Sequence, residues 1–300
     1  METGLIFAVL VAVFYGLGDN FARRGVLRAG ESYTTFLLSL LIGILFVLVI
    51  ITVRTEWGIL WHISGRAFTL LGAAGIMQFI GGRFLYFSAV RRIGVNKAGV
   101  ISRISIPIAV ILGIIILNEA VSATLILGVL FIIQGVILTG LERKSARNLN
   151  GESVPHRAQV NGILLTLTAG FFWGISGIFI RPALQEIESP FVGSLISYGS
   201  ALVVIAAFLF GKEPREKLAQ LNRPAIAPII ITGVLISAAN IFKYIALSLI
   251  PVSLVVPIVA TTVIYLYVFA FLINRKVEVF TPKIITGILL AAAGTIIITL

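Results

Sequence analysis

The sequence predicts an all-α integral membrane protein with ten transmembrane helices, built from two inverted five-helix repeats. Three observations predict this fold: an apolar composition, ten apolar stretches of similar length, and a correspondence between the two halves of the chain. Hydrophobic residues make up 59% of the 300 residues and charged residues 12%, whereas an ordinary soluble domain is about 45–50% apolar and about 25% charged. Lipid must therefore surround most of the chain, and spanning helices of about 20 residues each would leave only short connections.

The first half of the chain holds five apolar stretches, at residues 3–22, 33–53, 67–90, 97–117 and 122–141. Each is about as long as a helix that crosses a bilayer. The first stretch is too long and too rich in glycine for a signal peptide, and no basic region precedes it. We therefore expect it to remain in the protein as a helix.

The second half holds five more stretches, at residues 160–181, 190–210, 225–248, 252–273 and 281–299. Pro190, Pro224 and Pro282 lie at the start of three of them. Proline suits the first turn of a helix, because its missing N–H would have no partner there in any case. These prolines therefore support the predicted helix starts.

The polar residues 142–159 lie almost at mid-chain and predict a linker between a first repeat at 1–141 and a second repeat at 160–300. Seventeen of the 23 Lys and Arg residues fall in this linker and in the connections on the same predicted side of the membrane. Only three, Arg54, Arg66 and Arg181, fall in connections on the other side. Because cytoplasmic loops carry the excess of Lys and Arg, we expect the linker in the cytoplasm and both termini outside a plasma or inner membrane.

The two halves of the chain correspond to each other in a nearly constant frame. At a shift of 158 residues, Gly4, Phe14, Gly16, Phe21 and Arg23 correspond to Gly162, Phe172, Gly174, Phe179 and Arg181. At a shift of 159 residues, Glu119, Gly128 and Gly135 correspond to Glu278, Gly287 and Gly294. Because each half has an odd number of helices, the second copy enters the membrane inverted, which is an architecture that many secondary transporters use.

Several motifs in these repeats resemble a known family. The segments FYGLGDNFARR at 14–24, FFWGISGIFIR at 171–181 and SRISIPIAVILGIIILNEAVSATLILGVLFIIQG at 102–135 are similar to the duplicated EamA-type domain of the drug/metabolite transporter superfamily. The resemblance covers essentially the whole chain, although Pro107 has no counterpart at the matching place of the ninth helix, where Pro257 lies earlier. It implies a ten-helix exporter or exchanger of metabolites, and related translocators carry sugar phosphates or nucleotide sugars.

The composition also excludes several classes of site. The chain has no cysteine, and its two histidines, His62 and His156, fall in polar connections. We therefore expect no metal site, no cofactor and no enzymatic activity. The net charge of +11 reflects the cytoplasmic loops better than nucleic-acid binding, because no basic domain stands apart from the apolar stretches. No GxxxxGK[ST] loop is present, so ATP does not drive the protein directly.

Ionisable residues within the apolar stretches are the first candidates for function, because they are costly in a bilayer. Arg83 and Tyr86 lie on one helix face, and at a shift of 157 they correspond to Asn240 and Lys243. The alternative for each Lys or Arg is a side chain that reaches the lipid headgroups. The predicted substrate-binding residues, for a small solute with a negative group, are Tyr15, Arg83, Tyr86, Arg103, Trp173, Asn240, Lys243 and Tyr244.

Asp19 is the one carboxylate candidate within a predicted helix. We expect it to form a gate on the cytoplasmic side with Arg23 or Arg83, and a simple i,i+4 pair with Arg23 is the alternative. Glu119 and Glu278 precede helices by about three residues, which favours a capping role.

Small residues at a spacing of four, at Gly287, Ala291 and Thr295, indicate close helix contact. This contact is expected either between the fifth and tenth helices or between the protomers of a homodimer.

Together these features favour a secondary transporter of small polar metabolites that carry a carboxylate or phosphate, working by alternating access. The alternatives are a passive channel, a regulatory multipass membrane protein and, less favoured, an intramembrane lipid-modifying enzyme. The last would need a nucleophile and base or a metal near the headgroups, and neither histidine has a suitable partner nearby in the sequence.

Overall fold

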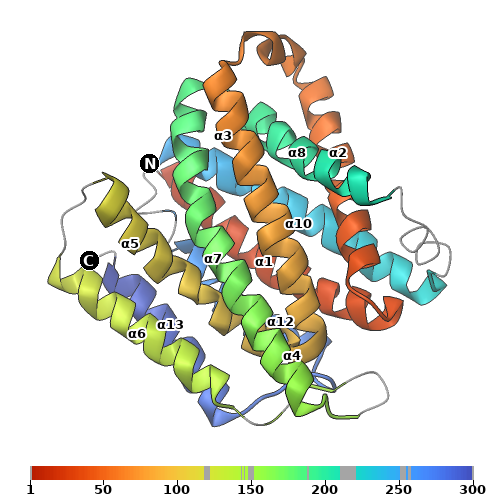
Figure 1. Cartoon of the computed structure of the whole chain (residues 1–300), viewed down its shortest axis with the longest axis vertical. Helices are drawn as coiled ribbons and strands as arrows, with labels where there is room; N and C mark the ends of the chain where they lie inside the picture. The colour runs from red at the N-terminus through yellow and green to blue at the C-terminus, as the bar shows by residue number, and fades with distance from the viewer. Residues whose placement is uncertain are drawn as a thin grey trace.

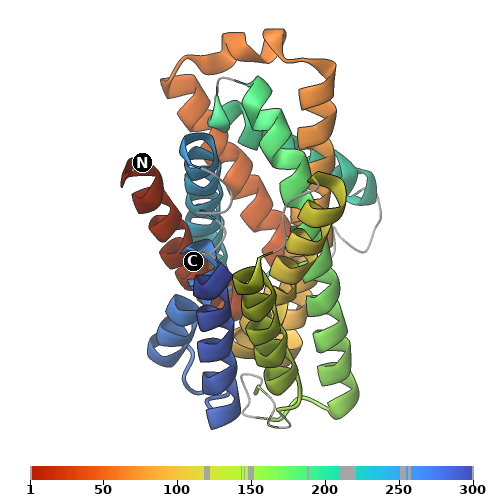
Figure 2. The ribbon, with the colours of Figure 1, turned by 90° about the vertical axis from the view of Figure 1, so that its left-hand side faces the viewer.

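The computed structural model describes residues 2–117, 122–142, 144, 146–147, 152–187, 189–209, 221–250, 255 and 258–298. Within these residues the chain is helical, and they contain no β-strand. The helices form an elongated bundle in which the two halves of the chain interlock (Figures 1 and 2). The all-α fold predicted from composition is therefore present.

The first half begins with two long helices, followed by a short 3₁₀-helix and a broken helical path. These elements are α1 (Glu2–Ala29), α2 (Tyr33–Val53), η1 (Glu56–His62), α3 (Gly65–Gly75), η2 (Ile76–Phe84), α4 (Leu85–Ile101), η3 (Ser102–Ile104), α5 (Ser105–Leu117) and α6 (Ala123–Gly140). The first helix extends seven residues beyond its predicted end at residue 22. Element η2 is a π-helix, which the apolar pattern did not predict.

The second half contains α7 (His156–Glu186), α8 (Pro190–Leu209), α10 (Arg223–Leu249), α12 (Thr262–Ile273) and α13 (Pro282–Ile298). Pro190 and Pro282 are the first residues of their helices, and Pro224 lies in the first turn of α10. The helix starts predicted from these three prolines are confirmed. Helix α7 begins four residues before its predicted start at residue 160.

Six helical segments in the described part of the chain are long and apolar enough to cross a membrane, and three shorter apolar helices accompany them. One of the six runs over residues 65–112 and covers the third predicted helix and most of the fourth. Inside it, Gly94 leaves the helical conformation with φ 80° and ψ 168°. This backbone region is accessible almost only to glycine, so a single residue makes the sharp break between the two predicted helices.

The predicted connection around Gly94 is much tighter than the sequence suggested. Lys97, three residues after Gly94, is 1% exposed. Its Nζ donates a hydrogen bond to the main-chain oxygen of Glu142, at 2.7 Å. The polar segment after α6 thus packs onto this end of the bundle.

The two halves interlock because helices of one half pack against helices of the other. Helix α1 packs against α10, and α7 packs against α3, η2 and α4 (Figure 1). Helices α6 and α13 also lie side by side in both views (Figure 2). A Cβ atom at Gly135 would lie 2.6 Å from the main-chain oxygen of Gly287, and one at Gly294 would lie 2.4 Å from that of Gly128. The close contact predicted from small residues therefore lies within the chain, between α6 and α13.

Candidate functional site

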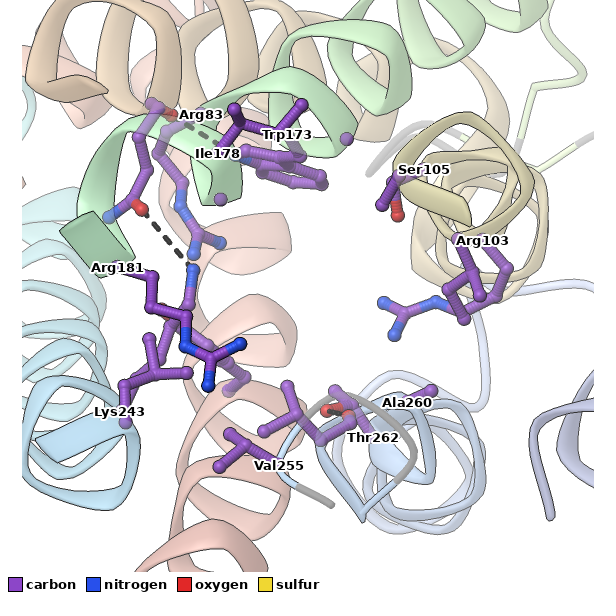
Figure 3. A pocket seen from close by; sticks show the side chains of 18 of the residues that line it. Arg83, Arg103, Ser105, Trp173, Ile178, Arg181, Lys243, Val255, Ala260 and Thr262 are labelled. Carbon is purple, nitrogen blue, oxygen red and sulfur yellow. Dashed lines mark hydrogen bonds between the residues drawn. The ribbon is translucent and has the colours of Figure 1, made fainter. Parts of the chain in front are cut away.

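A cavity of about 720 Å³ lies inside the bundle. Residues of α1, η2, α4, η3, α5, α7, α10 and α12 line it, so both halves of the sequence contribute (Figure 3). Its exposed lining residues, Gly177, Arg181 and Gln185, all lie on the second half of α7. In contrast, Asp19 and Arg83 are buried. The cavity is thus accessible from the side on which α7 ends.

The π-helix η2 positions Arg83 inside this cavity. A Cβ atom at Gly82 would lie 2.1 Å from Nε1 of Trp173, so only glycine lets α7 approach this closely. The Trp173 indole N–H donates to the main-chain oxygen of Gln78 at 3.0 Å, on the same π-helix. Such π-helical turns occur often at functional sites. Here the turn brings η2 and the aromatic face of α7 together around one arginine.

Arg83 forms a buried ion pair with Asp19, with 2.8 Å between Nη1 and Oδ1. Its guanidinium carbon also lies 4.9 Å from the ring centroid of Tyr15, 5.2 Å from that of Trp173 and 5.8 Å from that of Phe87. Aromatic rings at this distance attract a cation. Arg83 is therefore held by one carboxylate and three rings that come from α1, α4 and α7.

Behind these groups lies a polar network centred on Asn240, which is 1% exposed. Its Oδ1 accepts hydrogen bonds from Tyr15 Oη at 2.6 Å and from Gln78 Nε2 at 2.9 Å. Its Nδ2 donates to Tyr198 Oη at 2.9 Å and to the main-chain oxygen of Ile236 at 3.0 Å. All four hydrogen-bonding positions of the amide are used, so Asn240 orients residues that face the cavity.

Three further cations line the cavity. Lys243 donates to Oε1 of Gln78 at 3.3 Å. Arg103 donates from Nε to the main-chain oxygen of Gly99 at 3.3 Å, one turn earlier. Figure 3 shows the guanidinium groups of Arg103 and Arg181 directed into the space from opposite sides. Within the described residues, none of these three cations forms an ion pair.

The structure brings most of the predicted site residues together. Six of the eight predicted substrate-binding residues line the cavity, namely Tyr15, Arg83, Tyr86, Arg103, Trp173 and Lys243. Asn240 and Tyr244 do not line it. Tyr244 turns away from the cavity and donates from Oη to Ser197 Oγ at 2.9 Å, because the faces of α10 are divided between the cavity and α8.

The two residues predicted to form a gate have different partners. Asp19 lines the cavity and pairs with Arg83, not with Arg23. Arg23 is fully buried outside the cavity, and its Nε lies 2.9 Å from Oε1 of Glu278. Its Nη1 donates to the main-chain oxygens of Val90 and Arg91, at 2.6 Å and 2.8 Å. Arg23 therefore ties α1 to α4 and to the segment between α12 and α13.

Glu278 is therefore more than the helix cap that its sequence position suggested. It is buried against Gly94, and its Oε2 accepts a hydrogen bond from the main-chain N–H of Asn96 at 3.2 Å. Burial raises the pKa of the Glu278 carboxyl, while Arg23 and the main-chain donors oppose this rise. Glu119, its counterpart in the first repeat, lies outside the described residues.

The linker is fastened at the same end of the molecule. Arg23 Nη2 donates to the main-chain oxygen of Arg147 at 3.0 Å, and Thr281 donates to the Glu142 carboxylate. Partial burial would raise the pKa of the Glu142 carboxyl, but the hydrogen bonds from Thr281 and the Lys144 N–H and the nearby lysines outweigh it and hold this pKa below its usual range. This end of the bundle is thus closed by ionic and hydrogen-bonded contacts.

Sequence reasoning missed five polar residues that line the cavity, namely Gln78, Ser105, Arg181, Gln185 and Thr262. A signal existed for Arg181, because it corresponds to Arg23 in the repeat frame, but we assigned it to a connection outside the membrane. Gln78 lies five residues before Arg83, and only the π-helical turn brings both to the cavity. No feature of the apolar pattern predicted that turn.

The comparison with known families decides the class of this protein. The model of the EamA-like transporter family matches residues 2–141 and again residues 160–300. The chain belongs to the EamA-like transporter family. The resemblance seen in the sequence motifs is therefore confirmed, as is the duplication of the domain.

Two relatives and one solved structure are similar to this chain. An uncharacterized protein of Methanocaldococcus jannaschii is 26% identical over 144 residues, which are 47% of this chain and 98% of that protein. A protein of Clostridium kluyveri named as an uncharacterized transporter is 26% identical over 146 residues, which are 49% of this chain and 46% of that protein. A crystal structure described only as that of a protein has a TM-score of 0.66 at 15% identity and covers 97% of this chain and 94% of its own. At this identity the last comparison shows the fold alone.

Family membership and the apolar helices together identify an integral multipass membrane protein of a transporter family. This agrees with the expectation that the chain is not an enzyme. Because EamA-like proteins are transporters, the cavity between the two halves is the natural place to look for a substrate site.

Proposed function

We propose that this protein is a secondary transporter that exports or exchanges small polar metabolites bearing a carboxylate or phosphate group. The observation that carries the proposal is the charge of the cavity. In the part of the chain that the structure describes, the charged residues that line it are four cations, Arg83, Arg103, Arg181 and Lys243, and one carboxylate, Asp19. An anionic solute would supply the missing negative charge.

The charge balance supports an anionic substrate because cations are costly inside a bilayer unless they are paired. Asp19 compensates Arg83, which leaves Arg103, Arg181 and Lys243 facing the same space. Arginine can bind a carboxylate or phosphate through two parallel hydrogen bonds, and lysine acts as a point charge. In this proposal these cations contact the negative group of the substrate, and Tyr15, Tyr86 and Trp173 flank its remaining part.

The arrangement of the helices supports alternating access. Counting the broken segment over residues 65–112 as two crossings gives seven long crossings, and the three shorter apolar helices bring the total to ten. Five crossings per repeat would invert the second copy relative to the first. In this proposal the Arg23–Glu278 pair closes the cytoplasmic end, and rocking of the repeats would open it and close the entrance beside α7.

The proposal is tested in two steps with purified protein. A thermal-shift screen of organic acids, amino acids and phosphorylated metabolites identifies ligands, and anionic compounds are expected to dominate. The best ligand is then used in proteoliposomes, where a carrier shows saturable counterflow and a channel shows neither saturation nor counterflow. Stabilisation by cationic or neutral compounds only would contradict the anionic substrate, and flux without counterflow would contradict the carrier mechanism.

A further inference from the structure

The ion pair between Asp19 and Arg83 is the part of the cavity that the proposed function leaves unexplained. A carboxylate is unfavourable in a site for anions, yet Asp19 lies in this site and occupies its best-placed arginine. We propose that the substrate anion replaces Asp19 at Arg83, and that Asp19 takes up a proton as it is displaced. This inference rests on the proposed function and adds that anion and proton bind together.

Arg83 is held in place without the help of Asp19. The rings of Tyr15 and Trp173 lie on its guanidinium at 4.9 Å and 5.2 Å. Tyr15 is fixed by its 2.6 Å hydrogen bond to Asn240, and Trp173 by its 3.0 Å hydrogen bond to the main-chain oxygen of Gln78. When Asp19 leaves, the planar guanidinium would therefore stay in position to receive a carboxylate or phosphate.

Asp19 is bonded to this arginine through one nitrogen only, Nη1. A guanidinium carries five N–H donors, so the pair leaves most of them unused by Asp19. A substrate anion that binds two of these donors in parallel would compete well against a single contact. The geometry therefore makes Asp19 an occupant that can be displaced.

The surroundings of Asp19 explain why displacement brings a proton. Among the described residues it is the one carboxylate that lines the cavity, and it is 5% exposed. The charged and titratable groups that face it are Arg83 from η2, Arg103 from η3, Tyr86 from α4, and Tyr15 from its own helix. Once an anion takes Arg83, two negative groups share one buried space, and a carboxylate in that situation binds a proton.

The proton balance of the step is simple. The Asp19–Arg83 ion pair breaks, one proton from solution binds an Asp19 carboxylate oxygen, and the anion pairs with Arg83. The bound anion adds one negative charge to the site and the bound proton adds one positive charge. The net charge of the site therefore stays the same as before binding. Transport would consequently move anion and proton in the same direction.

The test uses benzenesulfonate as a probe, because it stays anionic over the whole range from about pH 5.5 to about pH 8.5. Calorimetric titration of the purified full-length protein in two buffers of different ionisation enthalpy gives the protons taken up per bound probe. We expect uptake approaching one proton, and an affinity that falls by up to about tenfold per pH unit where Asp19 is ionised. Binding to the wild-type protein without proton uptake would overturn the inference, whatever the variants do.

Variants assign the proton to Asp19. Lys243 is the competing candidate for the proton, since an anion would also favour the charged form of its amine. Asp19→Asn should bind the probe without proton uptake and without pH dependence, and Asp19→Glu should retain the uptake. Lys243→Arg, which keeps the positive charge and removes the titration, should keep the number of protons per bound probe. Uptake lost in Lys243→Arg but kept in Asp19→Asn would overturn the assignment.

The two levels of proposal fail in different ways. If neither benzenesulfonate nor inorganic phosphate binds at any pH, the anionic substrate of the proposed function is wrong, and this inference falls with it. If benzenesulfonate binds with no proton uptake, the anion site stands and Asp19 serves only to neutralise Arg83.

Discussion

At the scale of single residues, Arg83 carries most of the proposed recognition. Arg83→Lys should weaken binding of the best ligand about tenfold, or about 1.4 kcal/mol, because an ammonium lacks the planar fork that binds an anion at two points. Calorimetry or ligand-dependent thermal shifts measure the change. Arg66→Lys is the matched control, since Arg66 is exposed and pairs with Glu186 near the surface. Equal affinities of Arg83→Lys and the control would move the site elsewhere in the cavity.

Lys243 gives a second, independent prediction at this scale. Among the described residues its one hydrogen bond goes to Gln78 at 3.3 Å, so the ammonium is otherwise available to a ligand. Lys243→Gln should lower ligand affinity on the order of tenfold, while protein yield and melting temperature stay near those of the wild type. A side chain that only anchors its helix at the headgroups would instead leave affinity unchanged when replaced.

At the scale of elements, the break in the helical path at Gly94 is the place where a substitution should lower stability most. A Cβ atom there would lie 2.4 Å from Oε2 of Glu278, in a backbone conformation that other residues rarely adopt. Gly94→Ala should therefore both strain the backbone and push Glu278 from Arg23. We expect a loss of about 3 kcal/mol or more, the range for breaking a buried ion pair, seen as a lower melting temperature in detergent.

Gly30→Ala is the control for this substitution. Gly30 also has a positive φ, 75°, but no atom lies within 4 Å of a Cβ placed there. It should show only the backbone cost of about 1–2 kcal/mol. If the two variants melt at the same temperature, the contact between Gly94 and Glu278 contributes nothing measurable to the closed end.

Elements also show where sequence reasoning succeeded and failed. The prolines that start α8, α10 and α13, and the small residues between α6 and α13, act through local geometry or close approach, so their effects can be seen in the sequence. The π-helix η2 depends on α7 inserting Trp173 beside Gly82, which no local pattern records. Likewise Arg23 and Glu278 look like ordinary polar residues near helix ends until the fold buries them together.

At the scale of the whole molecule, the repeat gives related positions different environments. Arg23 and Arg181 correspond in sequence, yet Arg23 is buried in the closed end and Arg181 lines the accessible cavity. Under the proposed alternating access, one conformation would show this difference, because equivalent residues of inverted copies would then exchange roles between the two states. Under this proposal, the different surroundings of Arg23 and Arg181 identify the end at Arg23 as the closed one in this structure.

The membrane orientation can be tested cleanly, because the chain contains no cysteine. We expect the linker in the cytoplasm and the segment between α2 and α3 outside, since Lys and Arg gather on the linker side. His62 and Lys144 are both exposed, one in each segment. In intact cells a membrane-impermeant maleimide should label His62→Cys and leave Lys144→Cys unlabelled until the membrane is permeabilised. The opposite pattern would reverse the orientation, place the Arg23–Glu278 end outside, and make the accessible side of the cavity the cytoplasmic one.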